Sequence, residues 1–128
     1  MKKKRHVLIV EDDKYLLEFY KNLQAILKNE VDFKIATNGG SAIEILKKET
    51  FDSLILDLIM PEIDGYEVLA FLQKREKKSD KMHISVLTNL DTEEDRIRTK
   101  ELGANDYYVK ADLSNRVLKN IVLGVTIN

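Results

Sequence analysis

Charged and hydroxyl side chains follow short apolar runs at several places in this sequence. Glu11 and Asp12 come directly after the first run, Asp57 after another, and Thr88 and Lys110 after two later ones. Three carboxylates gathered in a small volume repel one another and raise each other's pKa values unless a cation lies among them. Mg²⁺ suits such a group, because it prefers oxygen ligands and is usually held by one or two carboxylates with waters and phosphate oxygens.

The same residue types suit phosphoryl transfer. A carboxylate can attack phosphorus and form an aspartyl phosphate. The ammonium of Lys110 and a bound cation would neutralise the equatorial phosphoryl oxygens, and the hydroxyl of Thr88 can donate to one of them. Each residue taken alone has a simpler interpretation, as part of a polar loop or as a helix cap. A phosphoryl-transfer site is favoured over these simpler interpretations, because the residues at all of these positions are chemically complementary.

The apolar runs before these residues have the patterns of β-strands. Residues 7–10, 54–56 and 84–87 are short and almost fully apolar, which is typical of strands buried on both faces. Residues 31–36 alternate between apolar and polar side chains, as in a more exposed strand, and residues 107–109 form the last run. We therefore predict five strands.

The segments between and after the strands carry the signals of helices. We expect Asp13 and Asp64 to cap two of them, Ser41 to cap another in a capping box with Glu44, and Asp112 to cap the last. The expected helices cover residues 15–28, 42–48, 65–75, 92–102 and 113 onward, with a glycine turn at 38–40 and a polar loop at 76–81.

The alternation of these elements indicates a single doubly wound α/β domain over residues 1–128. The strands start roughly twenty to thirty residues apart, which is the length that a right-handed βαβ crossover needs. In an open parallel sheet, the residues that follow the strands meet at the carboxyl edge, where ligands bind near the topological switch point. This topology therefore brings the carboxylates, the hydroxyl and the ammonium toward one crevice.

The composition excludes several other classes of protein. Lys and Arg total 21 against 22 for Asp and Glu, so the net charge of −1 gives no support to direct nucleic-acid binding. The sequence has no cysteine, which excludes disulfides and thiolate-based sites within it. Its apolar runs are far shorter than a membrane span, so we expect a cytoplasmic protein that does not bind membranes.

Three segments resemble the signature segments of response-regulator receiver domains, the chemotaxis-receiver-like modules of two-component signalling. They are Leu-Ile-Val-Glu-Asp-Asp at 8–13, Asp-Leu-Ile-Met-Pro-Glu-Ile-Asp-Gly at 57–65 and Gly-Ala-Asn-Asp-Tyr-Tyr-Val-Lys at 103–110. The resemblance covers nearly the whole chain in the right order and spacing. It implies a flavodoxin-like receiver fold with five helices and a five-stranded parallel sheet of order 2-1-3-4-5.

Carried over residue by residue, the resemblance implies that Asp57 is the phosphoacceptor. It implies that Glu11, Asp12 and Asp57 bind Mg²⁺ with the backbone carbonyl of Ile59, and that Lys110 pairs with the phosphoryl group. The donor would be a sensor histidine kinase or a histidine phosphotransfer protein. The chain would catalyse only the gain and loss of its own phosphoryl group, so we do not expect an enzyme in the ordinary sense.

The resemblance also implies a switch. Thr88 would reorient toward the phosphoryl group, and Tyr107 would change rotamer with activation. For Tyr107, a strand aromatic packed on a neighbouring helix is an equally good interpretation. The helix at 92–102 has few apolar residues, so we expect it to be loosely packed and able to shift. The fourth helix, fifth strand and fifth helix would form the surface for a downstream effector protein or domain, and for a homodimer.

Four positions depart from the family pattern. Ala111 stands where a proline with a cis bond usually follows the lysine, and a non-proline cis bond costs about 2.5–4 kcal/mol. We therefore predict a trans bond between Lys110 and Ala111. Asn89 replaces a very small residue, and Ile59 and Leu90 replace polar residues that orient the attacking water. An apolar approach to phosphorus predicts a long-lived aspartyl phosphate.

Ala111 and Asn89 leave one alternative open, an atypical receiver that acts mainly as a protein-interaction module with little phosphorylation. A haloacid-dehalogenase-like phosphatase is disfavoured, because it would carry a second aspartate where this chain has Ile59. A flavodoxin-type cofactor site is also disfavoured, since no glycine-rich or hydroxyl-rich phosphate loop follows the first strand.

Overall fold

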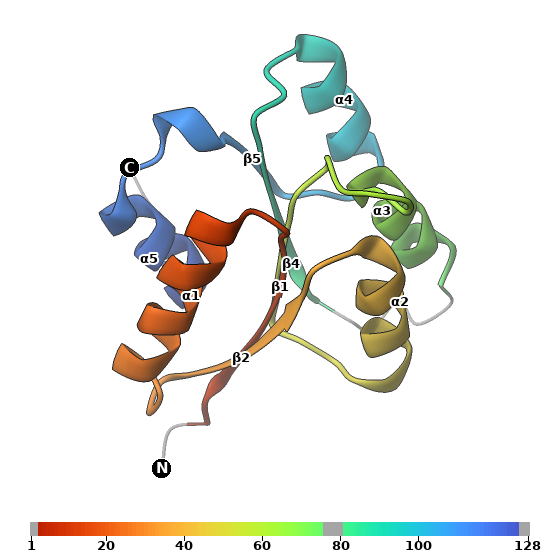
Figure 1. The fold of residues 1–128 in the computed structure, drawn as a ribbon. Coiled ribbons are helices and arrows are strands. Elements are labelled where there is room, and N and C mark those ends of the chain that lie inside the picture. The colour runs from red at the N-terminus through yellow and green to blue at the C-terminus, as the bar shows by residue number, and fades with distance from the viewer. Residues whose placement is uncertain (1–2, 76–80, 126–128) are drawn as a thin grey trace.

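The computed structural model describes residues 3–75 and 81–125. Helices cover both faces of a parallel sheet (Figure 1). The strands are β1 (Arg5–Val10), β2 (Val31–Ala36), β3 (Ser53–Leu56), β4 (His83–Thr88) and β5 (Asp106–Val109). The helices are α1 (Lys14–Ile26), α2 (Gly39–Lys48), α3 (Gly65–Lys74), α4 (Glu93–Glu101) and α5 (Asn115–Leu123), with a 3₁₀ turn, η1 (Lys110–Asp112), before α5. Apart from Lys81, the polar loop predicted at 76–81 lies outside the described residues.

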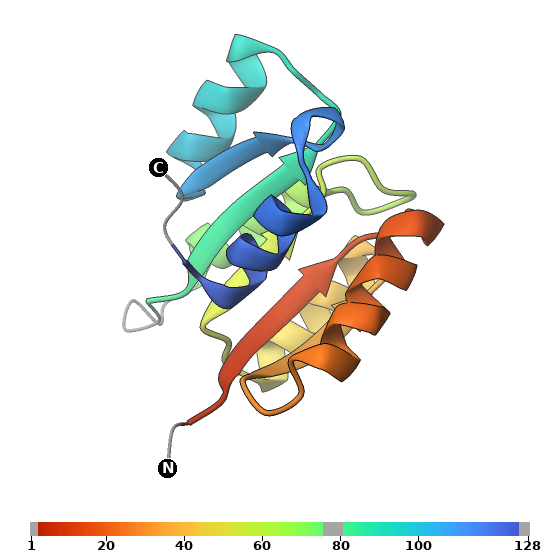
Figure 2. The same cartoon turned by 90° about the vertical axis from the view of Figure 1, so that its left-hand side faces the viewer.

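The sheet has the predicted topology. Its strands lie in the order β2-β1-β3-β4-β5 and every neighbouring pair is parallel. Helices α1 and α5 cover one face, and α2, α3 and α4 cover the other (Figures 1 and 2). The strand order reverses between β1 and β3, so the crevice expected for a ligand lies at the carboxyl ends of these two strands.

Each face of the sheet has its own apolar core, because successive strand residues point to opposite faces. Val7, Ile9 and Ile55 pack under α1 and α5, whereas Leu8 and Leu54 pack under α2 and α3. These strand side chains are at most 2% exposed to solvent. Burial on both faces explains why the runs before the polar residues are almost fully apolar.

The same alternation assigns the polar residues after the strands to faces. Glu11 and Asp57 are two residues beyond Ile9 and Ile55, so they lie on the α1 and α5 side of the sheet. Thr88 is two residues beyond Val86 and belongs to the opposite side. The carboxylates and the strand-end hydroxyl therefore approach the carboxyl edge from different faces.

Two of the four predicted helix caps are confirmed. The side chain of Asp13 accepts hydrogen bonds from backbone amides at the start of α1, and that of Asp64 does so at the start of α3. The predicted cap of α5 is wrong: Asp112 lies in η1, and the hydroxyl of Ser114 accepts from the amide of Val117 instead. The 3₁₀ turn takes up the expected cap residue, and α5 begins two residues later than predicted, at Asn115.

The prediction for the start of α2 is also wrong. Asn38 caps this helix by accepting from the amide of Ser41, and Gly39 and Gly40 belong to the helix, not to a turn. A Cβ atom on Gly39 would collide with the backbone carbonyl of Ile63. Glycine is therefore present because α2 approaches the loop before α3 closely. Within the described residues, none of the helices combines the length and the apolar character that crossing a membrane requires.

Candidate functional site

Lys110 joins two buried carboxylates at the carboxyl edge of the sheet. Its Nζ atom lies 2.9 Å from the carboxylate of Glu11 and 2.8 Å from Oδ2 of Asp57. Glu11 is 2% and Asp57 is 5% exposed, so water screens these charges poorly. One ammonium thus faces two carboxylates that come from the ends of β1 and β3.

The charge in this cluster is only partly balanced. Burial raises the pKa of Glu11 to about 7, and the negative charge of Asp57 adds to this effect, although the hydrogen bond and charge of Lys110 and the amide of Asp13 oppose it. Burial opposes the charge of Lys110, but the hydrogen bonds to Asp57 and Glu11 and the negative charges of both residues together outweigh burial and raise the pKa of Lys110. The cluster therefore favours an additional cation.

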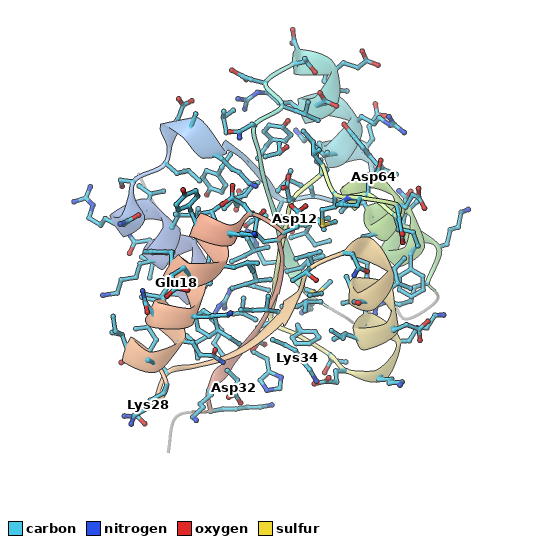
Figure 3. The ribbon with its side chains drawn as sticks, viewed as in Figure 1. Asp12, Glu18, Lys28, Asp32, Lys34 and Asp64 are labelled. Atoms are coloured by element: carbon cyan, nitrogen blue, oxygen red, sulfur yellow. The ribbon has the colours of Figure 1, made fainter. Side chains whose placement is uncertain are left out.

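Asp12 supplies a third carboxylate at the mouth of the cluster. One carboxylate oxygen from each of Glu11, Asp12 and Asp57 lies within 4.8 Å of the other two. Asp12 is exposed, at the opposite end of the sheet from Asp32 (Figure 3). Hard carboxylate oxygens at this spacing, with one side open to water, fit a divalent ion such as Mg²⁺. The structure thus brings together the three acidic residues that the sequence predicted.

Backbone amides hold the two buried carboxylates in place. The amides of Asp12 and Asp13 both donate to Oε2 of Glu11, at 3.1 Å each. The amide of Ile59 donates to Oδ1 of Asp57 at 3.2 Å, while Oδ2 faces Lys110. Ile59 thus contacts the site through its amide, whereas its side chain is 54% exposed. The role of its carbonyl as a metal ligand stays a prediction.

The two predicted switch residues meet at Leu90. Thr88 is fully buried, and its hydroxyl accepts a hydrogen bond from the amide of Leu90 at 3.3 Å. The hydroxyl of Tyr107 donates to the carbonyl of Leu90 at 2.6 Å, and the guanidinium of Arg96 lies 4.8 Å from the centre of its ring. These contacts link the end of β4, the loop after it, β5 and α4.

Lys110 reaches its partners without the proline that usually follows it. The bond between Lys110 and Ala111 is trans, as predicted from the cost of a cis bond. The chain continues into η1, where the amide of Leu113 donates to the carbonyl of Lys110 at 3.1 Å. The departure at Ala111 therefore leaves the contact of Lys110 with Asp57 in place.

Sequence reasoning missed two other features near this site. Tyr20 of α1 is buried against β1, and its hydroxyl has no hydrogen-bond partner among residues 3–75 and 81–125. Its spacing from Leu16 and Leu23 nevertheless marks it as a residue of the buried helix face. The hydroxyl of Tyr66 in α3 bonds to Asp95 in α4, a contact between residues too far apart in sequence for a local pattern to reveal.

Residues 7–122 match the family described as "Response regulator receiver domain". The chain therefore belongs to the response-regulator receiver family, whose members serve as phosphoacceptor switches in two-component signal transduction. The resemblance drawn from the three sequence segments is confirmed, and so is the fold class.

Relatives of known name and structure agree with this assignment. "Probable transcriptional regulator ycf27" of Cyanidium caldarium is 36% identical over 109 residues, which are 85% of this chain and 41% of that protein. The protein of the same name from Galdieria sulphuraria is 37% identical over 110 residues, which are 86% of this chain and 41% of that protein. This chain thus spans less than half the length of the curated relatives it matches.

Solved structures of response regulators have the same fold. The phosphorylated cyanobacterial phytochrome response regulator RcpA superposes with a TM-score of 0.79 at 25% identity, covering 95% of this chain and 91% of that one. The Mn²⁺-bound form of response regulator Rcp1 gives a TM-score of 0.73 at 28% identity, covering 94% and 90%.

Proposed function

We propose that Asp57 accepts a phosphoryl group from a sensor histidine kinase or a histidine phosphotransfer protein, in a reaction that depends on Mg²⁺. The observation that carries this proposal is that Lys110 lies between the buried carboxylates of Asp57 and Glu11, 2.8 Å and 2.9 Å away. An oxygen of Asp57 would attack phosphorus, and the bond from phosphorus to the donor nitrogen would break with its electron pair going to that nitrogen.

The other residues would position and neutralise the transferred group. Glu11, Asp12, Asp57 and the carbonyl of Ile59 would hold the divalent ion, which supplies positive charge against the phosphoryl oxygens. Lys110 already contacts the attacking carboxylate and would pair with a phosphoryl oxygen as charge develops. The only chemistry of the chain would be the gain and loss of this group.

The phosphoryl group would shift the domain between two states. Thr88 would turn toward a phosphoryl oxygen and release the amide of Leu90, whose carbonyl binds Tyr107. Helix α4 would then move, and a downstream effector or a second copy of the chain would bind the face formed by α4, β5 and α5. We propose that residues 1–128 act as one such domain in the cytoplasm, without direct nucleic-acid binding.

The test is incubation with acetyl phosphate in Mg²⁺ or in EDTA, followed by intact mass. We expect the mass of one phosphoryl group to be added only with Mg²⁺, and Asp57→Asn to remove the adduct. The matched control is Asp106→Asn, because Asp106 lies at the opposite end of the sheet beside His83. If the native chain stays unmodified with Mg²⁺, or is modified equally in EDTA, the proposal is wrong.

A further inference from the structure

Tyr20 carries a buried hydroxyl without a hydrogen-bond partner. It lies in α1, its side chain is 1% exposed, and within the described residues its hydroxyl is the one buried side-chain polar atom that forms no hydrogen bond. Leaving a hydroxyl unpaired in the interior lowers stability, whereas phenylalanine would fill the same space without this cost. An unpaired group that a simpler residue would avoid calls for a role in another state of the protein.

Tyr20 packs in the apolar core on the side of the sheet to which Glu11 and Asp57 belong. The side chain belongs to the core between the sheet and helices α1 and α5, together with Ile9 and Ile55. Glu11 and Asp57 are the next residues on the same face of β1 and β3. After burial itself, the charges of Glu11 and Asp57 raise the pKa of Tyr20, so both carboxylates act electrostatically on its hydroxyl.

Glu11 would lose a hydrogen-bond donor when the site binds a divalent ion. Its carboxylate accepts from Lys110 and from the amides of Asp12 and Asp13. The same ammonium contacts Asp57. When Glu11 turns toward a divalent ion, its carboxylate gives up the hydrogen bond from Lys110 in a region that water barely reaches. The phenol of Tyr20, which belongs to the core on the same side of the sheet, can replace that donor, and hydrogen bonds to ionised acceptors are the stronger kind.

We propose that Tyr20 is a positioning residue of this site, whose hydroxyl donates a hydrogen bond to the carboxylate of Glu11 when that carboxylate binds a divalent ion. The inference rests on the proposed function, because it needs Glu11 to be a metal ligand. This role differs from a purely structural one in one respect. The hydroxyl stabilises the metal-bound state and contributes nothing favourable to the stability of the metal-free state.

The experiment compares Mg²⁺ binding and stability in the native chain, Tyr20→Phe and Tyr108→Phe. Tyr108 packs on the same core from β5 and is the matched control for loss of a tyrosine hydroxyl. Isothermal titration should show that Tyr20→Phe raises the Kd for Mg²⁺ roughly tenfold, the size expected for one charge-assisted bond made only in the loaded state. Its urea midpoint without metal should equal or exceed that of the native chain. Tyr108→Phe should leave the Kd unchanged.

A second measurement needs only the native chain. In proton NMR the Tyr20 hydroxyl should gain a slowly exchanging, downfield-shifted resonance when Mg²⁺ is added, because it then donates inside the protein. An unchanged Kd in Tyr20→Phe, or a hydroxyl signal that ignores Mg²⁺, would overturn the inference and leave the proposed function standing. A native chain that binds no divalent ion would overturn both, and this separates the two failures.

Discussion

Helices α5 and α4 cover opposite faces of the sheet and are held there in different ways. α5 buries three apolar side chains, those of Leu118, Ile121 and Val122, in the core that also lies under Glu11 and Asp57. α4 buries only Thr99, and its largest apolar side chain, Ile97, is 51% exposed. The residues proposed for chemistry therefore lie over a packed core, whereas the helix proposed to move has little apolar contact with the rest of the protein.

Helix α4 is held by polar contacts instead of by a buried apolar core. The hydroxyl of Tyr66 in α3 bonds to Asp95, and the guanidinium of Arg98 lies 4.1 Å from the centre of the Tyr66 ring. On the other side, Arg96 lies over the ring of Tyr107. Contacts of this kind near solvent are weak individually and re-form easily with water. A helix held in this way can shift at low cost, while α5 cannot.

The largest expected effect compares the two helices directly. Leu118→Ala should lower the free energy of unfolding by about 2–5 kcal/mol, because it empties a filled position in the core. Ile97→Ala in α4 should change it by less than about 0.5 kcal/mol, since its side chain is half exposed. Urea unfolding of both variants measures the difference. Similar losses in the two variants would mean that α4 is packed as firmly as α5.

A smaller effect is expected at the metal site. Asp12→Asn should weaken Mg²⁺ binding at least roughly tenfold, equivalent to about 1.4 kcal/mol, because it removes one of three facing charges. Metal-free stability should not fall, since Asp12 is exposed and its charge adds to the repulsion. Asp95→Asn, which removes an acidic charge from α4, is the control and should leave the Kd unchanged. Undiminished Mg²⁺ binding by Asp12→Asn would exclude it as a ligand.

The next prediction concerns residues between the two regions. The amide of Ile59 holds Asp57, and the backbone of Leu90 binds both Thr88 and Tyr107. Neither side chain can orient a water molecule, so the aspartyl phosphate should be long-lived. The double variant Ile59→Asn, Leu90→Glu should lose its phosphate about tenfold faster, as followed by intact mass after removal of the donor. Equal or slower loss would show that these positions do not control the attacking water.

Local sequence patterns were enough to predict the strands and the acidic site. Residues 54–56 were expected as a strand and β3 is Ser53–Leu56, because a strand buried on both faces must be almost fully apolar. The approach of Glu11, Asp57 and Lys110 follows from parallel strands whose carboxyl ends meet at one edge. Each of these predictions needs only the strand pattern and the topology.

The features that the sequence did not reveal depend on contacts between distant segments. Gly39 was interpreted as a turn residue, but it is a helix residue that makes room for the carbonyl of Ile63. The pairing of Tyr66 with Asp95 needs α3 and α4 to be placed side by side. That the hydroxyl of Tyr20 has no hydrogen-bond partner within the described part of the chain is apparent only from the positions of its neighbours. Local patterns carry no information about such pairings.

The smallest expected effect tests whether polar contacts hold α4. Tyr66→Phe removes the hydroxyl that bonds to Asp95 and keeps the ring that lies under Arg98. Stability should fall by less than about 1 kcal/mol, because Asp95 is near solvent and water can replace the lost bond. Amide hydrogen exchange should nevertheless become about two- to threefold faster in α4, since local opening responds to the contacts that the opening breaks.

The amides of α5 provide the internal control for this measurement. Because the core under α5 does not include Tyr66, their exchange should change only by the small loss in global stability. Faster exchange in both helices by the same factor would mean that α4 opens only with the whole domain. Unchanged exchange in α4 would mean that the bond from Tyr66 to Asp95 does not hold the helix. Acceleration confined to α4 would establish it as a separately moving unit, which is what a switch on this face of the sheet requires.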